Sequence, residues 1–139
     1  MRIFDSLEVA GSSLTAHRLW MDTISSNLAN INTTRTKAGG PYKRRVPVFS
    51  EMLDNTLGGY HDIGGVRVLE ITEDNGAPRM TYQPDHPDAN EDGYVAYPNV
   101  NLVREMTDML VASRAYEANL SVVTTTRDMW NGALDVMRG

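Results

Sequence analysis

The chain has 139 residues, no cysteine, a hydrophobic content of 41% and a formal net charge of −5. This length corresponds to a single domain, and the absence of cysteine excludes disulfide bonds and thiolate chemistry. The acidic balance argues against a general binder of nucleic acid or of acidic membrane surfaces.

The first predicted element is a helix over residues 3–31, whose apolar residues step by four and three as in a coiled-coil seam. Asp5 is expected to cap its start with Glu8 three residues later, and the polar residues 30–34 are expected to end it. These carboxylates interrupt the apolar run that a cleavable signal peptide requires, so no such signal is predicted. The seam consists of Ile3, Leu7, Ala10, Leu14, His17, Met21, Ile24, Leu28 and Ile31.

His17 is the polar exception on this seam. A histidine here is either a metal ligand or pH switch, or a partly solvated polar break in the apolar stripe. The seam carries no second His, Asp or Glu, which favours the polar break.

Residues 35–98 form an insert of different composition, with all six prolines between 41 and 98 and eight of the eleven glycines between 39 and 93. Such a segment is typical of strands and loops, so a small sheet or hairpin is predicted. Strands are expected at residues 66–71, 80–82 and 94–97. Turns are expected at the Gly-Gly, Asn-Gly and Asp-Gly pairs that begin at residues 64, 75 and 92.

Charge is segregated within this insert. A basic run contains Arg35, Lys37, Lys43, Arg44 and Arg45. An acidic segment follows it in the chain and contains Glu70, Glu73, Asp74, Asp85, Asp88, Glu91 and Asp92, with Arg79 as the one basic residue among them. The basic run could contact nucleic acid, pair with the acidic segment of a neighbouring molecule, or be solvated. Tyr42 is its only aromatic residue and the chain is acidic overall, which disfavours nucleic acid.

Residues 88–93 match the opening of a calcium loop. The twelfth position of that loop is Asn99 rather than a bidentate glutamate, and three prolines between 78 and 87 prevent an entering helix. An Asx-rich turn is therefore favoured, and a weak calcium-binding module remains the alternative. The three histidines share no metal-ligand spacing, and the Gly-Gly pairs lack a phosphate-binding context. No catalytic, cofactor or metal site is predicted, and no small-molecule substrate.

The last predicted element is a long helix over residues 99–139, with no Gly or Pro between 99 and 131. Its heptad seam is Leu102, Met106, Met109, Ser113, Tyr116, Leu120, Val123, Arg127, Trp130, Leu134 and Met137. Other apolar residues lie off this seam, including Val103, Leu110, Val111, Val122 and Met129. A helix that is apolar over more than one seam requires more than one helical neighbour, and repeated contacts of that kind build rings or filaments.

Four stretches carry a resemblance to the flagellar basal-body rod family, and in particular to its proximal rod members. Residues 26–34 read Ser-Asn-Leu-Ala-Asn-Ile-Asn-Thr-Thr, and residues 39–45 read Gly-Gly-Pro-Tyr-Lys-Arg-Arg. Residues 97–101 read Tyr-Pro-Asn-Val-Asn, and residues 112–119 read Ala-Ser-Arg-Ala-Tyr-Glu-Ala-Asn. These motifs occur in the family's order along nearly the whole chain.

The resemblance implies a structural subunit that is exported without a cleaved signal into the periplasmic space. There it would polymerise with other copies and other rod proteins, and link the membrane ring and export gate to the distal rod so that torque is transmitted. No nucleic-acid partner and no membrane insertion are expected. Residues 1–34 and 99–139 are expected to be loose in the isolated subunit and to order against their neighbours. A coiled-coil adaptor that does not polymerise is the alternative.

The expected fold class is mainly α with a small β insert, divided into an N-terminal helix (1–34), a strand-and-loop insert (35–98) and a C-terminal helix (99–139). The expected interface between subunits combines the two seams with the motif residues. It consists of Ile3, Leu7, Leu14, Met21, Ile24, Asn27, Leu28, Asn30, Asn32, Leu102, Met106, Met109, Ser113, Arg114, Tyr116, Asn119, Leu120, Val123, Arg127, Trp130 and Leu134.

Overall fold

The computed structural model describes residues 2–52 and 64–138, with side chains from residue 5 onward. Two long helices lie at the ends of this chain, α1 (Arg2–Ala29) and α2 (Leu102–Arg138). Between them the described residues form four strands, β1 (Arg45–Met52), β2 (Gly65–Glu73), β3 (Arg79–Tyr82) and β4 (Tyr94–Tyr97). The mainly α fold class with a small β insert is confirmed.

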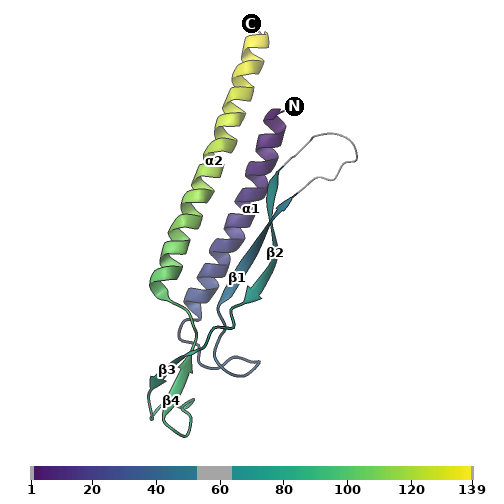
Figure 1. The fold of residues 1–139 in the computed structure, drawn as a ribbon. Helices are drawn as coiled ribbons and strands as arrows, with labels where there is room; N and C mark the ends of the chain where they lie inside the picture. The colour runs from purple at the N-terminus through teal and green to yellow at the C-terminus, as the bar shows by residue number, and fades with distance from the viewer. Residues whose placement is uncertain (1, 53–63, 139) are drawn as a thin grey trace.

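The helix α1 occupies the middle of the molecule. Figure 1 shows α2 running antiparallel to α1 on one side, while the β1–β2 hairpin lies along α1 on another side. Trp20 of α1 packs edge-on against Phe49 of β1, with ring centroids 5.8 Å apart. The apolar surface of α1 beyond its seam is thus covered in part by the chain's own hairpin.

The sequence predicted the C-terminal end of α1 correctly, but not the role of Asp5 at its N-terminal end. The helix begins at Arg2, so Asp5 lies inside its first turn and is not its cap. A carboxylate there still interacts favourably with the positive end of the helix dipole. The predicted end is confirmed, because α1 stops at Ala29 and the Asn30 side chain donates a hydrogen bond to the Ser26 carbonyl at 2.9 Å.

The insert forms two separate two-stranded antiparallel sheets, β1–β2 and β3–β4. The predicted strands at 66–71, 80–82 and 94–97 are confirmed as parts of β2, β3 and β4. The strand β1 was missed. Pro47 lies within it and pairs with Ile71, which a two-stranded ribbon tolerates because both of its strands are edges.

The helix α2 begins with a cap that the sequence motif at 97–101 supplies. The Asn101 side-chain oxygen accepts a hydrogen bond from the backbone N–H of Arg104 at 3.1 Å. This satisfies one of the free N–H groups in the first turn of the helix. From there α2 runs for 37 residues and continues past the N-terminal end of α1 (Figure 1). Across the described ranges 2–52 and 64–138, neither helix has the length and apolarity needed to cross a membrane.

Candidate assembly interface

Small residues are prominent among the buried positions of α1 and α2. The side chains of Ala10 and Ala16 on α1 and of Ala112 on α2 are buried, as are those of Thr23 and Thr126. Short side chains at such positions let two helix backbones approach closely. Among the described residues of the two helices, three of the four buried apolar side chains are alanines, while the leucines and methionines of the predicted seams are half-buried or exposed.

A buried polar cluster joins the lower ends of the two helices to the segment before β1; we call it the buried joint. Its members are Asn27 of α1, Tyr42 and Arg44 of the connecting segment, and Glu105 of α2. Arg44 Nε donates to Glu105 Oε1 at 2.6 Å, and Asn27 Nδ2 donates to Glu105 Oε2 at 3.1 Å. Asp108 lies 3.6 Å from the Arg44 guanidinium. The Glu105 carboxylate is completely buried, so the Arg44 cation and the Asn27 amide replace its hydration.

Asn27 also fixes the direction in which the chain leaves the loop. Its Oδ1 accepts hydrogen bonds from the Arg45 backbone N–H at 2.9 Å and from the Tyr42 hydroxyl at 3.0 Å. Its Nδ2 donates to the Arg45 carbonyl at 2.8 Å. Asn27 thus satisfies backbone groups inside its own chain. With 1% exposure, its side chain belongs to the joint of one subunit.

Sequence reasoning missed the buried joint as a unit. Arg44 was assigned to an exposed basic run, and Glu105 was not singled out. A glutamate in the first turn of a helix is normally a solvated residue, which hides a buried one from any local pattern. One signal was present, because Glu105 falls at the start of a second heptad that continues through Ala112, Asn119 and Thr126.

Three residues of the basic run pair within the chain, an arrangement that none of our three alternatives included. Besides the Arg44–Glu105 pair, Lys43 lies 3.7 Å from Glu73 and Arg35 lies 3.8 Å from Asp88. These two further pairs are largely exposed, so each contributes little stability, on the order of 0–1 kcal/mol.

The seam of α2 that packs on α1 differs from the predicted one. The buried residues of α2 are Glu105, Ala112 and Thr126, one position before Met106, Ser113 and Arg127 of the predicted seam. Met109, Tyr116 and Val123, which we predicted, are half-buried beside them. Leu134 is half-buried as well, while Leu102, Met106, Leu120 and Trp130 are exposed.

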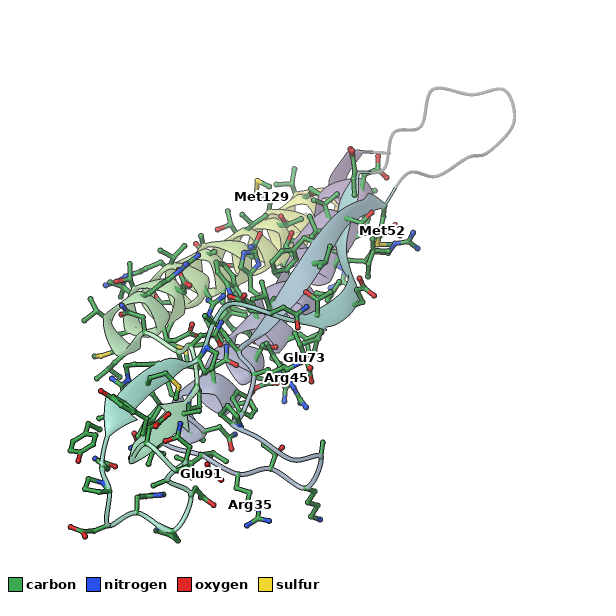
Figure 2. All side chains as sticks on the ribbon, turned by 60° about the horizontal axis from the view of Figure 1, so that its bottom comes forward. Arg35, Arg45, Met52, Glu73, Glu91 and Met129 are labelled. Carbon is green, nitrogen blue, oxygen red and sulfur yellow. The ribbon has the colours of Figure 1, made fainter. Side chains whose placement is uncertain are left out.

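Two apolar stripes on α2 face away from α1. At about 100° per residue, one stripe contains Leu102, Val103, Met106, Leu110 and Leu120, and the other contains Val111, Val122, Met129 and Val136. The polar residues Thr107, Arg114, Ser121 and Thr125 separate them. Within the described residues α2 packs on α1 and on none of the strands, so both stripes remain uncovered in the single chain. Figure 2 shows Met129 on this outer side of α2.

The remaining predicted interface residues are distributed over both helices. On α1, Leu7, Leu14, Met21 and Leu28 are half-buried and Ile24 is buried; Ile3 lies outside the residues with described side chains. Ser113 and Asn119 are half-buried, and the Asn119 amide donates to the Ala115 carbonyl at 2.8 Å. Arg127 is exposed, as is Arg114, which pairs with Glu117 at 3.0 Å. Asn32 is exposed beyond the end of α1.

Residues 88–93 form the turn that the Asx pattern predicted. Asn90 Oδ1 accepts hydrogen bonds from the backbone N–H groups of Asp92 and Tyr94, at 3.1 and 2.8 Å. Asp88 Oδ2 accepts a hydrogen bond from the Thr34 hydroxyl at 2.8 Å. Among residues 2–52 and 64–138, no three His, Cys, Asp or Glu residues gather into a possible metal site. His17 is half-buried, with its Nδ1 2.7 Å from the Ser13 carbonyl oxygen, and His61 lies outside the described residues.

Comparison with known proteins places both terminal segments in one group. A family model described as flagella basal body rod protein matches residues 7–37. A second, described as flagellar basal body rod FlgEFG protein C-terminal, matches residues 91–136. These two matches contain most of α1 and α2, the cap of α2, and Asn27 and Glu105 of the buried joint, whereas Tyr42 and Arg44 of the joint lie between the two matched segments.

Whole-length relatives point the same way. A protein from Borreliella burgdorferi named flagellar basal-body rod protein FlgC is 43% identical, over 100% of both chains. The protein of the same name from Bacillus subtilis is 41% identical over 98% of this chain and 99% of its own. That from Aquifex aeolicus is 38% identical over 99% of each chain.

Proposed function

The chain belongs to the FlgC family of flagellar basal-body rod proteins and is a structural subunit of the proximal rod, and from this premise we propose that it polymerises through its terminal helices. The observation that carries the proposal is the pair of uncovered apolar stripes on α2. A long helix with two such stripes on either side of a polar strip presents surfaces for two further helices. The half-buried seam residues of α1 would complete these contacts.

The proposed partners are other copies of this chain, other rod proteins, and the membrane ring and export gate at the base of the rod. In that position the subunit would transmit torque between the ring and the distal rod. A helix pair locked by a buried joint supports such a role, because it resists being pulled apart along its axis. The proposed location is the periplasmic part of the basal body.

Export without a cleaved signal is part of the same proposal. A chain that passes unfolded through a narrow channel must be able to lose its structure at modest cost. The absence of cysteine and the largely uncovered α2 support this, because a single helix pair with one buried face has little apolar burial to lose.

The polymerisation proposal is tested by adding a charge to one stripe of α2. Met106→Glu and Leu120→Glu are expected to leave the helical circular dichroism of the purified chain unchanged, since both side chains are exposed in the single subunit. In cells lacking the natural protein, each variant is expected to be absent from purified basal bodies and to abolish swimming. Immunoblotting of basal bodies and motility on soft agar are the measurements.

Thr125→Glu is the matched control, because it adds the same charge in the polar strip between the stripes. It is expected to retain incorporation and swimming. Normal incorporation of Met106→Glu and Leu120→Glu would contradict polymerisation through α2. A purified chain that forms a discrete, fully helical dimer would instead favour the coiled-coil adaptor.

A further inference from the structure

A cationic pocket lies at the foot of the molecule, between the loop that follows α1 and the start of β1. Its volume is about 370 Å³, and its charged lining residues are Lys37, Lys43, Arg45 and Glu73. Glu73 lies near Lys43, at 3.7 Å, whereas Lys37 and Arg45 make no ion pair within residues 2–52 and 64–138. The pocket therefore carries two positive charges in excess. Figure 2 shows Arg45 and Glu73 side by side at this place.

An exposed acidic surface lies on the turn between β3 and β4. It consists of the carboxylates of Asp85, Glu91 and Asp92, which are exposed and form no ion pair with any described residue of the chain. We call it the acidic turn. Beside it the rings of Tyr82 and Tyr94 are exposed and meet edge-on, with centroids 5.3 Å apart.

The acidic turn is held rigidly. Asn90 accepts two backbone hydrogen bonds across it, and the Gln83 N–H donates to the Gly93 carbonyl at 2.9 Å. On the other face of the hairpin Val95 is completely buried. A preorganised surface with exposed tyrosines loses little conformational entropy on binding, which is a property of interface surfaces.

Both features lie at the same end of the molecule. Figure 1 shows the loop after α1 and the β3–β4 hairpin at the foot of α1, extending to opposite sides. Within one chain they are joined at their bases by the Thr34–Asp88 hydrogen bond of 2.8 Å and the Arg35–Asp88 pair of 3.8 Å. Their relative position is thus set by contacts inside the subunit.

We propose that the acidic turn of one copy of this chain docks into the cationic pocket of the next copy. Charge complementarity identifies the occupant, because the acidic turn carries three carboxylates without an ion pair and the pocket carries two cations without one among the described residues. Because the two surfaces differ and lie on opposite sides of one end, the contact is heterologous and repeats from copy to copy around a ring or helix. The proposal rests on the rod function and adds a lateral contact outside the terminal helices.

Disulfide trapping in assembled basal bodies tests this contact. The chain has no cysteine, so two versions, Ala38→Cys in the pocket lining and Glu91→Cys in the acidic turn, are produced together in one cell. A disulfide between the two versions can form only between copies. We expect a cross-linked dimer under oxidising conditions, since docking brings the two positions within the short range that a disulfide spans.

Charge reversal shows whether the trapped contact is electrostatic. Adding Lys37→Glu and Lys43→Glu to the Ala38→Cys version is expected to lower the dimer yield about tenfold, the change that 1.4 kcal/mol produces. Adding Asp85→Lys and Asp92→Lys to the Glu91→Cys version as well is expected to restore the yield, because the attraction is re-formed with exchanged signs. Arg67→Glu, which reverses an exposed cation on β2 away from the pocket, is the control and is expected to change nothing.

Three outcomes overturn the proposal: no dimer, a dimer yield insensitive to charge reversal, or a reversal that the exchanged pair does not restore. Each of these three outcomes is measured in basal bodies that contain the chain. Absence of both versions from the basal bodies would instead refute the rod function, so the two failures are distinguishable by immunoblotting of the same particles.

Discussion

At the scale of single residues, Asn27, Arg44 and Glu105 decide how the two helices are held. The Glu105 carboxylate is desolvated, and among the described residues the Arg44 cation and the Asn27 amide compensate its charge. Removal of one partner from such a pair leaves a buried charge without compensation, which costs about 3–5 kcal/mol. Replacement of both partners by apolar residues of similar size removes the charge itself and costs much less.

The first prediction at this scale is therefore a double-mutant cycle in the isolated chain. Arg44→Met is expected to lower the free energy of unfolding by about 3–5 kcal/mol, and Arg44→Met with Glu105→Leu by far less. Lys43→Met, which removes an exposed pair, is the control and is expected to cost at most about 1 kcal/mol. Urea unfolding followed by circular dichroism measures all three. Equal destabilisation by the single and the double variant would show that Glu105 needs no compensation.

At the scale of elements, the β3–β4 hairpin depends on one glycine. Gly93 has a φ of +79°, and a Cβ atom there would lie 2.9 Å from Cε2 of Tyr82. Gly40 has a similar φ of +71° but open space around it. The two positions thus separate the cost of the left-handed backbone from the cost of displacing the tyrosine ring.

Gly40→Ala is expected to destabilise by about 1 kcal/mol through its backbone alone. Gly93→Ala is expected to cost more, because it must also move Tyr82 out of its edge-on contact with Tyr94. Thermal unfolding gives the difference, and the near-ultraviolet circular dichroism of the tyrosines reports the displaced ring. Identical stability and identical tyrosine spectra for the two variants would contradict the close packing of Tyr82 on Gly93.

At the scale of the whole molecule, burial is distributed unevenly. The helix α1 has α2 on one side and the β1–β2 hairpin on another, whereas among the described helices and strands α2 packs only on α1, and it extends past the end of α1. Local stability follows the density of buried contacts. The structure is therefore expected to be most stable around the buried joint and least stable at the far end of α2.

Hydrogen exchange makes this a measurable prediction. In the isolated chain the amides of α1 and α2 are expected to exchange faster than in the assembled rod, with the slowest near Asn27 and Glu105 and the fastest beyond Trp130. In the assembled rod the same amides are expected to exchange slowly, because neighbouring subunits cover the apolar stripes of α2. Equal protection in the two states would contradict the idea that assembly completes the fold.

Local patterns in the sequence were sufficient to predict the two terminal helices, the β insert between them and the family. The heptad spacing is a local pattern and the turn residues act locally, so neither depends on distant contacts. The β3–β4 turn was predicted for the same reason, since Asn90 and Gly93 build it from within. The uncovered apolar surface of α2 was also predictable from the sequence, because the helix carries more apolar residues than one partner helix can bury.

Contacts between distant segments determine which seam of α2 faces α1, where β1 lies, and that Arg44 and Glu105 form a buried pair. The Asn27–Glu105 contact joins residues 78 positions apart, so no local pattern contains it. Two overlapping heptads on α2 are equally periodic, and the choice between them depends on contacts with α1 and Arg44, which lie far away in the sequence. The strand β1 depends likewise on its pairing with β2, which overrides the weak strand preference of a segment that contains Pro47.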